Sequence, residues 1–497
     1  MNNVDLSDKE KHSSTRLIMG YLGYTIFFVG LFCLIPLFVI PFYPDEIVYA
    51  PYFILPSTIS IIIGYFLSRL AKDIKGRQLQ GHQDAVLVLL VWITTIAICS
   101  VPFFLSGQYN IMQSIFESTS GFTTTGLSIV DVKFAPNIIL LYRSMMHFLG
   151  GVGLVLVITS VLSDRYGFRL YNAEGHNDLL IPNLIKSSRI ILTIYIFYII
   201  LGIIFYVILG MPFFDAINHS IASVSTGGFS TRVDSIGYYN NVGIEIVTIC
   251  LMLLGSTNFF IHLHLLKGRI GNVFRHGETK LFIFLTVMIL PIIIFVLIQS
   301  GYSFGSALRI GSFQYITAIT TTGFQTVATF QGMDGIFLIF MILLMLIGAG
   351  VGSTGGGIKQ HRVLLIIKTV YWNLRDNLGS PRRITPRLMN RAGIQYVVTQ
   401  KEQSDAISFV FLYMLIFLMG TLVFVSYGNS LVDSMFEFAS SLGTVGLSIG
   451  ITSYNAPSLI LLTSILGMIF GRMEIYVILY AIINSVTNLS KKDVKYL

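Results

Sequence analysis

Long apolar runs separated by short polar segments make up most of this chain. Ten of these runs contain no Asp, Glu, Lys or Arg, and they cover residues 17–44, 47–68, 85–116, 144–163, 190–214, 246–266, 281–308, 335–358, 406–432 and 438–471. A helix needs about 20 apolar residues to cross the hydrocarbon core of a bilayer. The pattern therefore predicts an all-α integral membrane protein. Several runs are too long for one crossing and too short for two, so part of each has another use.

The basic residues gather in alternate polar segments. The basic segments contain Lys9, Lys11, Arg16, Lys72, Lys75, Arg77, Lys267, Arg269, Arg275, Arg382, Arg383, Arg387, Arg391, Lys491, Lys492 and Lys495. Cytoplasmic loops carry an excess of Lys and Arg. We therefore predict ten transmembrane helices, two at the N-terminus and then four pairs, with both termini in the cytoplasm.

Composition supports a membrane protein and excludes other classes. The 497 residues are 54% hydrophobic and only 11% charged, whereas a soluble domain has about 25% charged residues. An ordinary cytosolic enzyme, a disordered protein and a secreted disulfide scaffold are excluded. The net charge of +8 reflects topology and does not indicate nucleic acid.

A short block rich in Ser, Thr and Gly recurs four times, each time between the two helices of a pair. The blocks are Ser120-Gly-Phe-Thr-Thr-Thr-Gly126-Leu-Ser128, Ala222-Ser-Val-Ser-Thr-Gly-Gly228-Phe-Ser230, Thr317-Ala-Ile-Thr-Thr-Thr-Gly323-Phe-Gln325 and Ser440-Ser-Leu-Gly-Thr-Val-Gly446-Leu-Ser448. A polar residue stands nine positions before each aligned glycine, namely Glu117, His219, Gln314 and Glu437. The surrounding short segments predict half-helices that dip into the membrane, which explains the excess length of the apolar runs.

Extended backbone survives at membrane depth only where protein or a water-filled cavity surrounds it. Four such loops around one axis would supply rings of carbonyl oxygens, which replace the hydration shell of a potassium ion in filters built from Thr-Val-Gly loops. Glycine permits the backbone angles that such a strand needs. The predicted potassium-binding residues are Thr124, Thr125, Gly126, Thr226, Gly227, Gly228, Thr321, Thr322, Gly323, Thr444, Val445 and Gly446. The alternative is that small residues pack helices closely, but four copies at matching places favour a filter.

A second glycine-rich segment lies at 348–357. It contains Gly348, Gly350, Gly352, Ser353, Thr354, Gly355, Gly356 and Gly357. Each glycine in a helix interior costs about 1 kcal/mol relative to alanine. We therefore expect the second helix of the third pair to be broken here, with a helix-packing face as the alternative.

Two arginines stand inside apolar segments. Arg472 lies near the middle of a predicted last helix over 456–489, where a charge costs about 2.5–3.5 kcal/mol. Glu474 lies on nearly the opposite helix face, so we expect Arg472 to point into the bundle, with a snorkelling role as the alternative. Arg143 needs a buried acidic partner, and the candidates are Glu117 and Glu437.

Three histidines, His147, His262 and His264, lie in or beside apolar runs. Histidine titrates near neutral pH, so each is a candidate proton carrier. Their spacing does not suggest a metal site.

With these motifs in place, the chain resembles the Trk/Ktr/HKT superfamily of potassium transporters, and most closely the Trk-type membrane subunit. The four blocks, the segment 348–357 and the sequence Gly471-Arg472-Met-Glu474, similar to the family's Gly-Arg-(Leu/Met)-Glu signature, carry the resemblance. It implies four pseudo-symmetric helix–pore-loop–helix repeats around one central pore. It also implies that the segment 348–357 and Arg472 gate the pore beneath the filter.

The resemblance further implies a homodimer and a cytosolic nucleotide-binding regulator of the Trk-A or RCK type. In this family a serine at the first filter glycine is associated with sodium transport, and Gly126 points to potassium. The expected divisions are 1–80 (N-terminus and two extra helices), 81–170, 171–270 and 271–372 (repeats 1 to 3), 373–403 (a cytoplasmic basic segment) and 404–497 (repeat 4).

We therefore expect channel-like potassium uptake, with potassium as the transported ion and no organic cofactor. The alternatives are a proton- or sodium-coupled symporter and the potassium-translocating subunit of a larger pump. The sequence contains no Walker loop, no phosphorylatable Asp-Lys-Thr-Gly motif and no nucleophile elbow. We expect no enzymatic activity.

Overall fold

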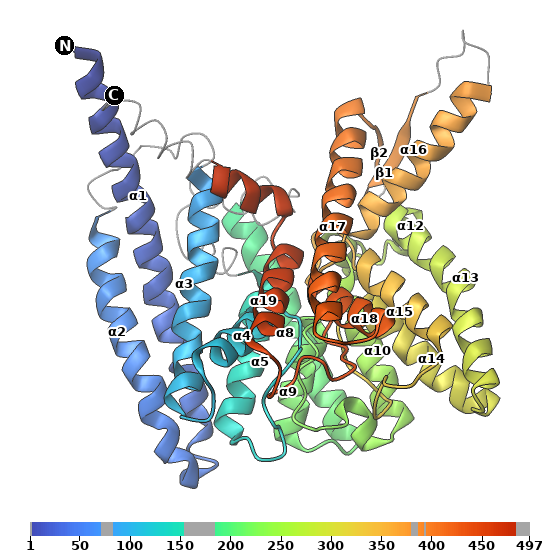
Figure 1. The fold of residues 1–497 in the computed structure, drawn as a ribbon, viewed down its shortest axis with the longest axis horizontal. Coiled ribbons are helices and arrows are strands. Elements are labelled where there is room, and N and C mark those ends of the chain that lie inside the picture. The colour runs from blue at the N-terminus through green and yellow to red at the C-terminus, as the bar shows by residue number, and fades with distance from the viewer. Residues whose placement is uncertain (1, 71–82, 154–183, 379–385, 392–393, 484–497) are drawn as a thin grey trace.

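The computed structural model describes residues 2–70, 83–153, 184–378, 386–391 and 394–483 (Figure 1). These residues are mostly helical, and one two-stranded hairpin of β1 (Leu388–Arg391) and β2 (Ile394–Val397) stands beside them. The predicted helical character is confirmed, and the hairpin is the one departure from an all-α fold among the described residues. The basic residues 72–77, 382–383 and 491–495, used above to predict orientation, lie outside the described residues.

Two N-terminal helices form one edge of the molecule (Figure 1). Helix α1 (Asn2–Phe32) packs along α2 (Ala50–Arg69), and both contact α3. The short turns η1 (Ile35–Val39) and η2 (Pro44–Tyr49) join them. A Cβ atom built on Gly64 would overlap the backbone of Phe27, so this glycine allows the close approach of backbones that is typical of membrane helices.

The rest of the chain repeats one order of elements four times: a long helix, a short helix, a loop and a second helix. The units are α3 (Gln83–Leu105), α4 (Ile111–Phe122) and α5 (Asn137–Val152); α8 (Leu184–Ile208), α9 (Phe213–Val224) and α10 (Val242–Ser256); α13 (Gly277–Gln299), α14 (Phe304–Ile319) and α15 (Gly335–Ile347); and α17 (Gln400–Ser426), α18 (Leu431–Leu442) and α19 (Ser458–Arg472). The remaining elements are η3 (Ser235–Tyr239), α11 (Phe259–Leu266), α12 (Ile270–Arg275) and α16 (Gln360–Leu378).

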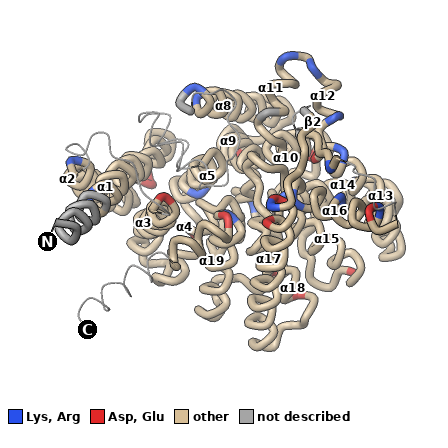
Figure 2. The backbone as a smooth tube through the Cα atoms, turned by 90° about the horizontal axis from the view of Figure 1, so that it is seen from above, with Lys and Arg blue, Asp and Glu red and all other residues tan. Residues whose placement is uncertain are grey.

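The units contact one another in cyclic order. The second helix of each unit packs on the short helix of the next: α5 on α9, α10 on α14 and α15 on α18. The last contact, of α19 with α4, closes the circle (Figure 2). Charged residues are sparse along the helices, and basic residues gather around α11 and α12 (Figure 2).

Six helices of the described residues are long and apolar enough to cross a membrane, or seven if the bent pair Ser458–Arg472 and Ile475–Ile483 counts as one span. The second helices α10 and α15 are apolar but shorter. Several membrane-spanning helices are thus confirmed. The number ten, the orientation and the six divisions of the chain stay predictions.

The last helix differs from the expectation. It ends at Arg472 and does not continue to 489, because Met473 is extended (φ −85°, ψ 148°) and the following helix turns by 105°. Arg472, Met473 and Glu474 are good helix formers, and the single Gly471 beside them is not enough for local propensity to predict a break. Arg472 donates hydrogen bonds to carbonyl oxygens of other segments, and these tertiary contacts accompany the break.

Candidate functional site

Three of the four short helices begin at a side-chain cap. Asn110 accepts a hydrogen bond from the Gln113 amide in a capping box, Ser303 caps α14 and Ser430 caps α18. A cap satisfies backbone N–H groups that have no partner within the helix. Asn110, Ser303 and Ser430 therefore mark the starts of these three short helices.

All four short helices end in the same backbone conformation. A threonine with positive φ follows each C-cap, and the values are +53° at Thr124, +50° at Thr226, +55° at Thr321 and +49° at Thr444. The next amide returns to a carbonyl oxygen in the last helical turn, at 3.0 Å for Thr125 to Ser120 and 2.9 Å for Val445 to Ser440. Such left-handed residues cost about 1–2 kcal/mol in a residue with a Cβ. Threonine at all four positions, where glycine would be easier, indicates that the hydroxyl is needed.

The four loops that follow, residues 123–128, 225–230, 320–325 and 443–448, are named loops 1 to 4. They meet side by side in a closed ring. A Cβ built on Gly126 would overlap the Gly227 carbonyl oxygen, and the same holds for Gly228 on Thr322, Gly323 on Val445 and Gly446 on Thr125. Each of these four glycines also has a positive φ. The structure thus brings together all twelve residues that the sequence predicts as a filter.

The left-handed threonines are fully buried, and their hydroxyls divide into two pairs. The Thr226 hydroxyl lies 3.0 Å from that of Thr354, and the Thr321 hydroxyl accepts from the Gly356 amide at 2.9 Å. The hydroxyls of Thr124 and Thr444 have no hydrogen-bond partner among the described residues. A buried polar atom without a partner costs free energy, so two ring oxygens are left for a ligand.

The polar residue nine positions before each ring glycine braces the loop of its own unit. Glu117 accepts from the Ser128 hydroxyl at 2.9 Å, and Glu437 accepts from the Ser448 hydroxyl at 2.7 Å. The imidazole of His219 lies 2.9 Å from the Ser230 hydroxyl, and the Gln314 amide donates to Thr326 at 3.3 Å. These four residues therefore fix the extended chain that follows each ring glycine.

Arg143 pairs with only one of its two candidate partners. Its guanidinium donates to Glu117 at 2.7 Å and to the Ser128 hydroxyl at 2.8 Å, and it packs over the ring of Phe229. Glu437 is not its partner, because this carboxylate is occupied by Ser448 and by the amides of Ile449 and Thr452 in its own unit. Arg143 thus joins loop 1 to loop 2.

The glycine-rich segment 348–357 breaks the helix between α15 and α16 and lies against the ring. Thr354 reaches Thr226, and Gly356 has room only for a hydrogen atom beside the Thr444 hydroxyl. Thr354 also donates to the carbonyl oxygens of Gly255 and Val224, at 2.9 and 3.1 Å. The segment therefore covers the ends of loops 2, 3 and 4.

Arg472 lies beside this segment. Its guanidinium donates to the carbonyl oxygens of Thr354 and Gly150, which belong to the third and first units. Glu474, two residues on, pairs with Arg362 at 2.6 Å. The predicted separation of Arg472 from Glu474 is thus observed, and Arg472 points into the bundle.

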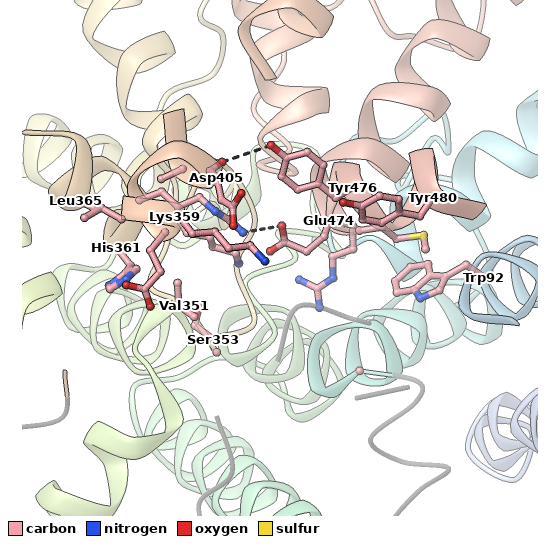
Figure 3. A pocket seen from close by; sticks show the side chains of 18 of the residues that line it. Trp92, Val351, Ser353, Lys359, His361, Leu365, Asp405, Glu474, Tyr476 and Tyr480 are labelled. Atoms are coloured by element: carbon pink, nitrogen blue, oxygen red, sulfur yellow. Dashed lines mark hydrogen bonds and ion pairs between the residues drawn. The ribbon is translucent and has the colours of Figure 1, made fainter. Parts of the chain in front are cut away.

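Arg472 and Val351, Gly352 and Ser353 of the glycine-rich segment line a cavity of about 560 Å³, which Figure 3 shows from close by. Lys359, Arg362 and Glu474 line it together with Asp405 and Tyr476. Figure 3 shows the Tyr476 hydroxyl directed at Asp405. The Glu474 carboxylate pairs with Arg362 at 2.6 Å. Arg472 therefore stands between the ring and this cavity.

Sequence reasoning missed two residues that hold these parts. Glu278, at the start of α13, accepts from the Val351 amide at 3.0 Å and so anchors the glycine-rich segment. Lys359 donates to the Gly355 carbonyl oxygen. His262, one of the three candidate proton carriers, has its imidazole 3.0 Å from the Tyr198 hydroxyl. In the sequence, Glu278 is marked only by its place just before the apolar run 281–308.

The chain is similar in sequence to known cation transporters. A family model described as TrkH, cation transport protein, matches residues 51–491. An uncharacterized cation transporter of Methanocaldococcus jannaschii is 30% identical over 93% of this chain and 94% of its own length. The Trk system potassium uptake protein TrkG of Escherichia coli is 30% identical over 93% of this chain and 97% of its own length.

The fold is also found in a solved structure. The crystal structure of the potassium transporter TrkH from Vibrio parahaemolyticus superimposes with a TM-score of 0.81 at 24% identity, covering 94% of this chain and 98% of that one. The match of the family model over most of the chain, together with these relatives, decides the family. This chain belongs to the TrkH family of cation transport proteins.

Proposed function

We propose that this chain takes up potassium ions across the cell membrane through a channel-like path along the axis of the ring. The observation that carries the proposal is the closed ring of four loops, in which the buried hydroxyl oxygens of Thr124 and Thr444 have no partner among the residues that the structure describes. A potassium ion gives up its hydration shell only where oxygens of a filter replace the water. Two named relatives, TrkG and TrkH of Escherichia coli, are potassium uptake proteins.

Electrostatics supports a cation at the ring. All four short helices end at it, and the C-terminal end of a helix carries partial negative charge. The repeats around one pore then follow from the cyclic packing of the four units. The membrane potential would drive inward movement by about 2.3 kcal/mol per charge per 100 mV.

We assign the gate to the segment 348–357 and Arg472. The segment covers the ring, and Arg472 places a fixed positive charge between the ring and the cavity. A cation in transit is repelled by this charge. Conduction therefore requires the segment and Arg472 to move away from the axis.

We also propose that the chain forms a homodimer and binds a cytosolic regulator. Helix α16, the β1–β2 hairpin and the start of α17 form a small unit around Trp372 and Met389. The Arg375 and Arg387 guanidinium groups hold the pKa of Asp376 below its ordinary value. We assign this unit to the cytoplasm, where it offers a surface to a nucleotide-binding subunit.

Uptake by purified protein in liposomes tests the function. We expect potassium to enter down its own gradient when no proton or sodium gradient is present. Potassium entry that requires either gradient would favour the symporter. No potassium entry by the chain alone or with a cytosolic regulator, in liposomes and in potassium-uptake-deficient cells, would contradict the proposal.

A further inference from the structure

The imidazole of His147 lies between the last turn of α4, which leads into loop 1, and loop 2 of the ring. Its Nδ1 atom is 2.9 Å from the carbonyl oxygen of Gly121, and its Nε2 atom accepts from the Phe229 amide at 3.3 Å. A carbonyl oxygen only accepts hydrogen bonds, so Nδ1 must carry the proton and Nε2 must be bare. Both ring nitrogens of this neutral side chain are thus used, one for the last turn of α4 and one for loop 2.

The same imidazole also fills the space behind loop 2. It lies 4.2 Å from the Phe229 ring, centroid to centroid, and a Cβ on Gly227 would overlap it. Arg143, one turn earlier on α5, lies over Phe229 at 3.9 Å. Two side chains of α5, His147 and Arg143, therefore both contact Phe229, the residue that follows Gly228.

The other three units have a different residue at this position. His147 is the eleventh residue of α5, and the eleventh residues of α10, α15 and α19 are Met252, Met345 and Met468. All four are buried with no exposed surface. Methionine has no hydrogen-bond donor and only a weak acceptor, so only the junction of loops 1 and 2 is fixed by hydrogen bonds from this position.

We propose that His147 is a positioning residue that sets the spacing of loops 1 and 2, and through it the preference of the ring for potassium over sodium. The inference rests on the proposed function. Carbonyl oxygens select an ion by the distance and number of their contacts. A change of spacing at one junction therefore changes selectivity even though His147 does not touch the ion.

The test compares potassium and sodium entry into liposomes for the wild type, H147M and H147Q. We expect H147M, which carries the residue of the other three units, to lower the potassium-to-sodium ratio about fivefold, the worth of an ordinary hydrogen bond. H147Q can keep one hydrogen bond, and we expect about a twofold fall. M345L changes the equivalent position of the third unit and should keep the wild-type ratio.

A wild-type ratio in H147M would overturn the inference. So would a wild-type ratio in H147Q, which decides the matter if H147M does not accumulate in the membrane. An equal fall in M345L would also overturn it, because packing and not hydrogen bonding would then set the spacing. If the wild type itself admits no potassium, the proposed function fails, and that result is distinct from a failure at His147.

Discussion

The guanidinium of Arg472 donates a hydrogen bond to the carbonyl oxygen of Thr354, which links the last helix to the glycine-rich segment. The same group reaches the Gly150 carbonyl oxygen in the first unit. A single cation therefore ties three of the four units together on the side of the ring that faces the cavity.

Arg472→Ala should raise potassium flux. Two unit charges 4 Å apart interact by about 4 kcal/mol near a protein surface, so release of even part of this repulsion corresponds to about tenfold faster uptake. Arg472→Lys keeps the charge and is the matched control. Liposome flux measures both variants, and wild-type flux in Arg472→Ala would assign Arg472 to structure alone.

Gly126→Ser should reduce the preference for potassium over sodium. A Cβ at Gly126 would overlap the Gly227 carbonyl oxygen, and the backbone has φ +89°. Loops 1 and 2 must then separate. Competition between potassium and sodium in flux assays measures the change.

Gly210→Ser is the control for Gly126→Ser. Gly210 has a similar φ of +93°, but a Cβ there would have no atom within 4 Å. It therefore reproduces the backbone strain without the contact in the ring. Loss of selectivity in both variants alike would show that strain, and not ring spacing, is responsible.

Thr444→Val should weaken potassium uptake without lowering stability. The Thr444 hydroxyl is buried and has no protein partner among the described residues. Replacing a polar atom without a partner by an apolar group of similar shape is nearly neutral or stabilising. A higher potassium concentration for half-maximal uptake, with an unchanged thermal midpoint in detergent, is the expected result.

Thr95→Val provides the comparison for Thr444→Val. The hydroxyl of Thr95, in α3, is also buried without a partner among the described residues, but it lies outside the ring. Its loss should leave both uptake and stability unchanged. If Thr444→Val behaves in the same way, the Thr444 oxygen does not bind the ion.

Arg143→Met should destabilise the protein by about 3–5 kcal/mol, because it leaves the buried Glu117 carboxylate without its cation. Adding Glu117→Gln should restore part of this loss. Unfolding in detergent measures each variant. Equal stability of the single and double variants would contradict a strong coupling between these two side chains.

Much of the site could be predicted from the sequence because its chemistry repeats. The four Thr- and Gly-containing blocks and the polar residue nine positions before each glycine are local signals. The break after Ile347 follows from the density of glycines. In contrast, the choice of Glu117 over Glu437 by Arg143 depends on which unit lies beside α5, and one sequence does not contain that information.

The break at Met473 could not be predicted from the sequence for a related reason. Residues 456–489 are apolar and contain good helix formers, so propensity predicts a continuous rod. The turn depends on contacts of Arg472 and on the Arg362–Glu474 pair, which join residues more than a hundred positions apart. His147 was predicted as a possible proton carrier, and its contacts with the last turn of α4 and with loop 2 depend on the same long-range packing.

The contact of α19 with α4 has a consequence for biosynthesis. These helices lie more than three hundred residues apart in the chain, and their contact completes the circle. After the first three units have been inserted into the membrane, the circle of contacts is still open, because α19 has not yet been made. A nonsense mutation before codon 458 removes α19 and would therefore leave the circle open, and we expect quality-control proteases to remove the product.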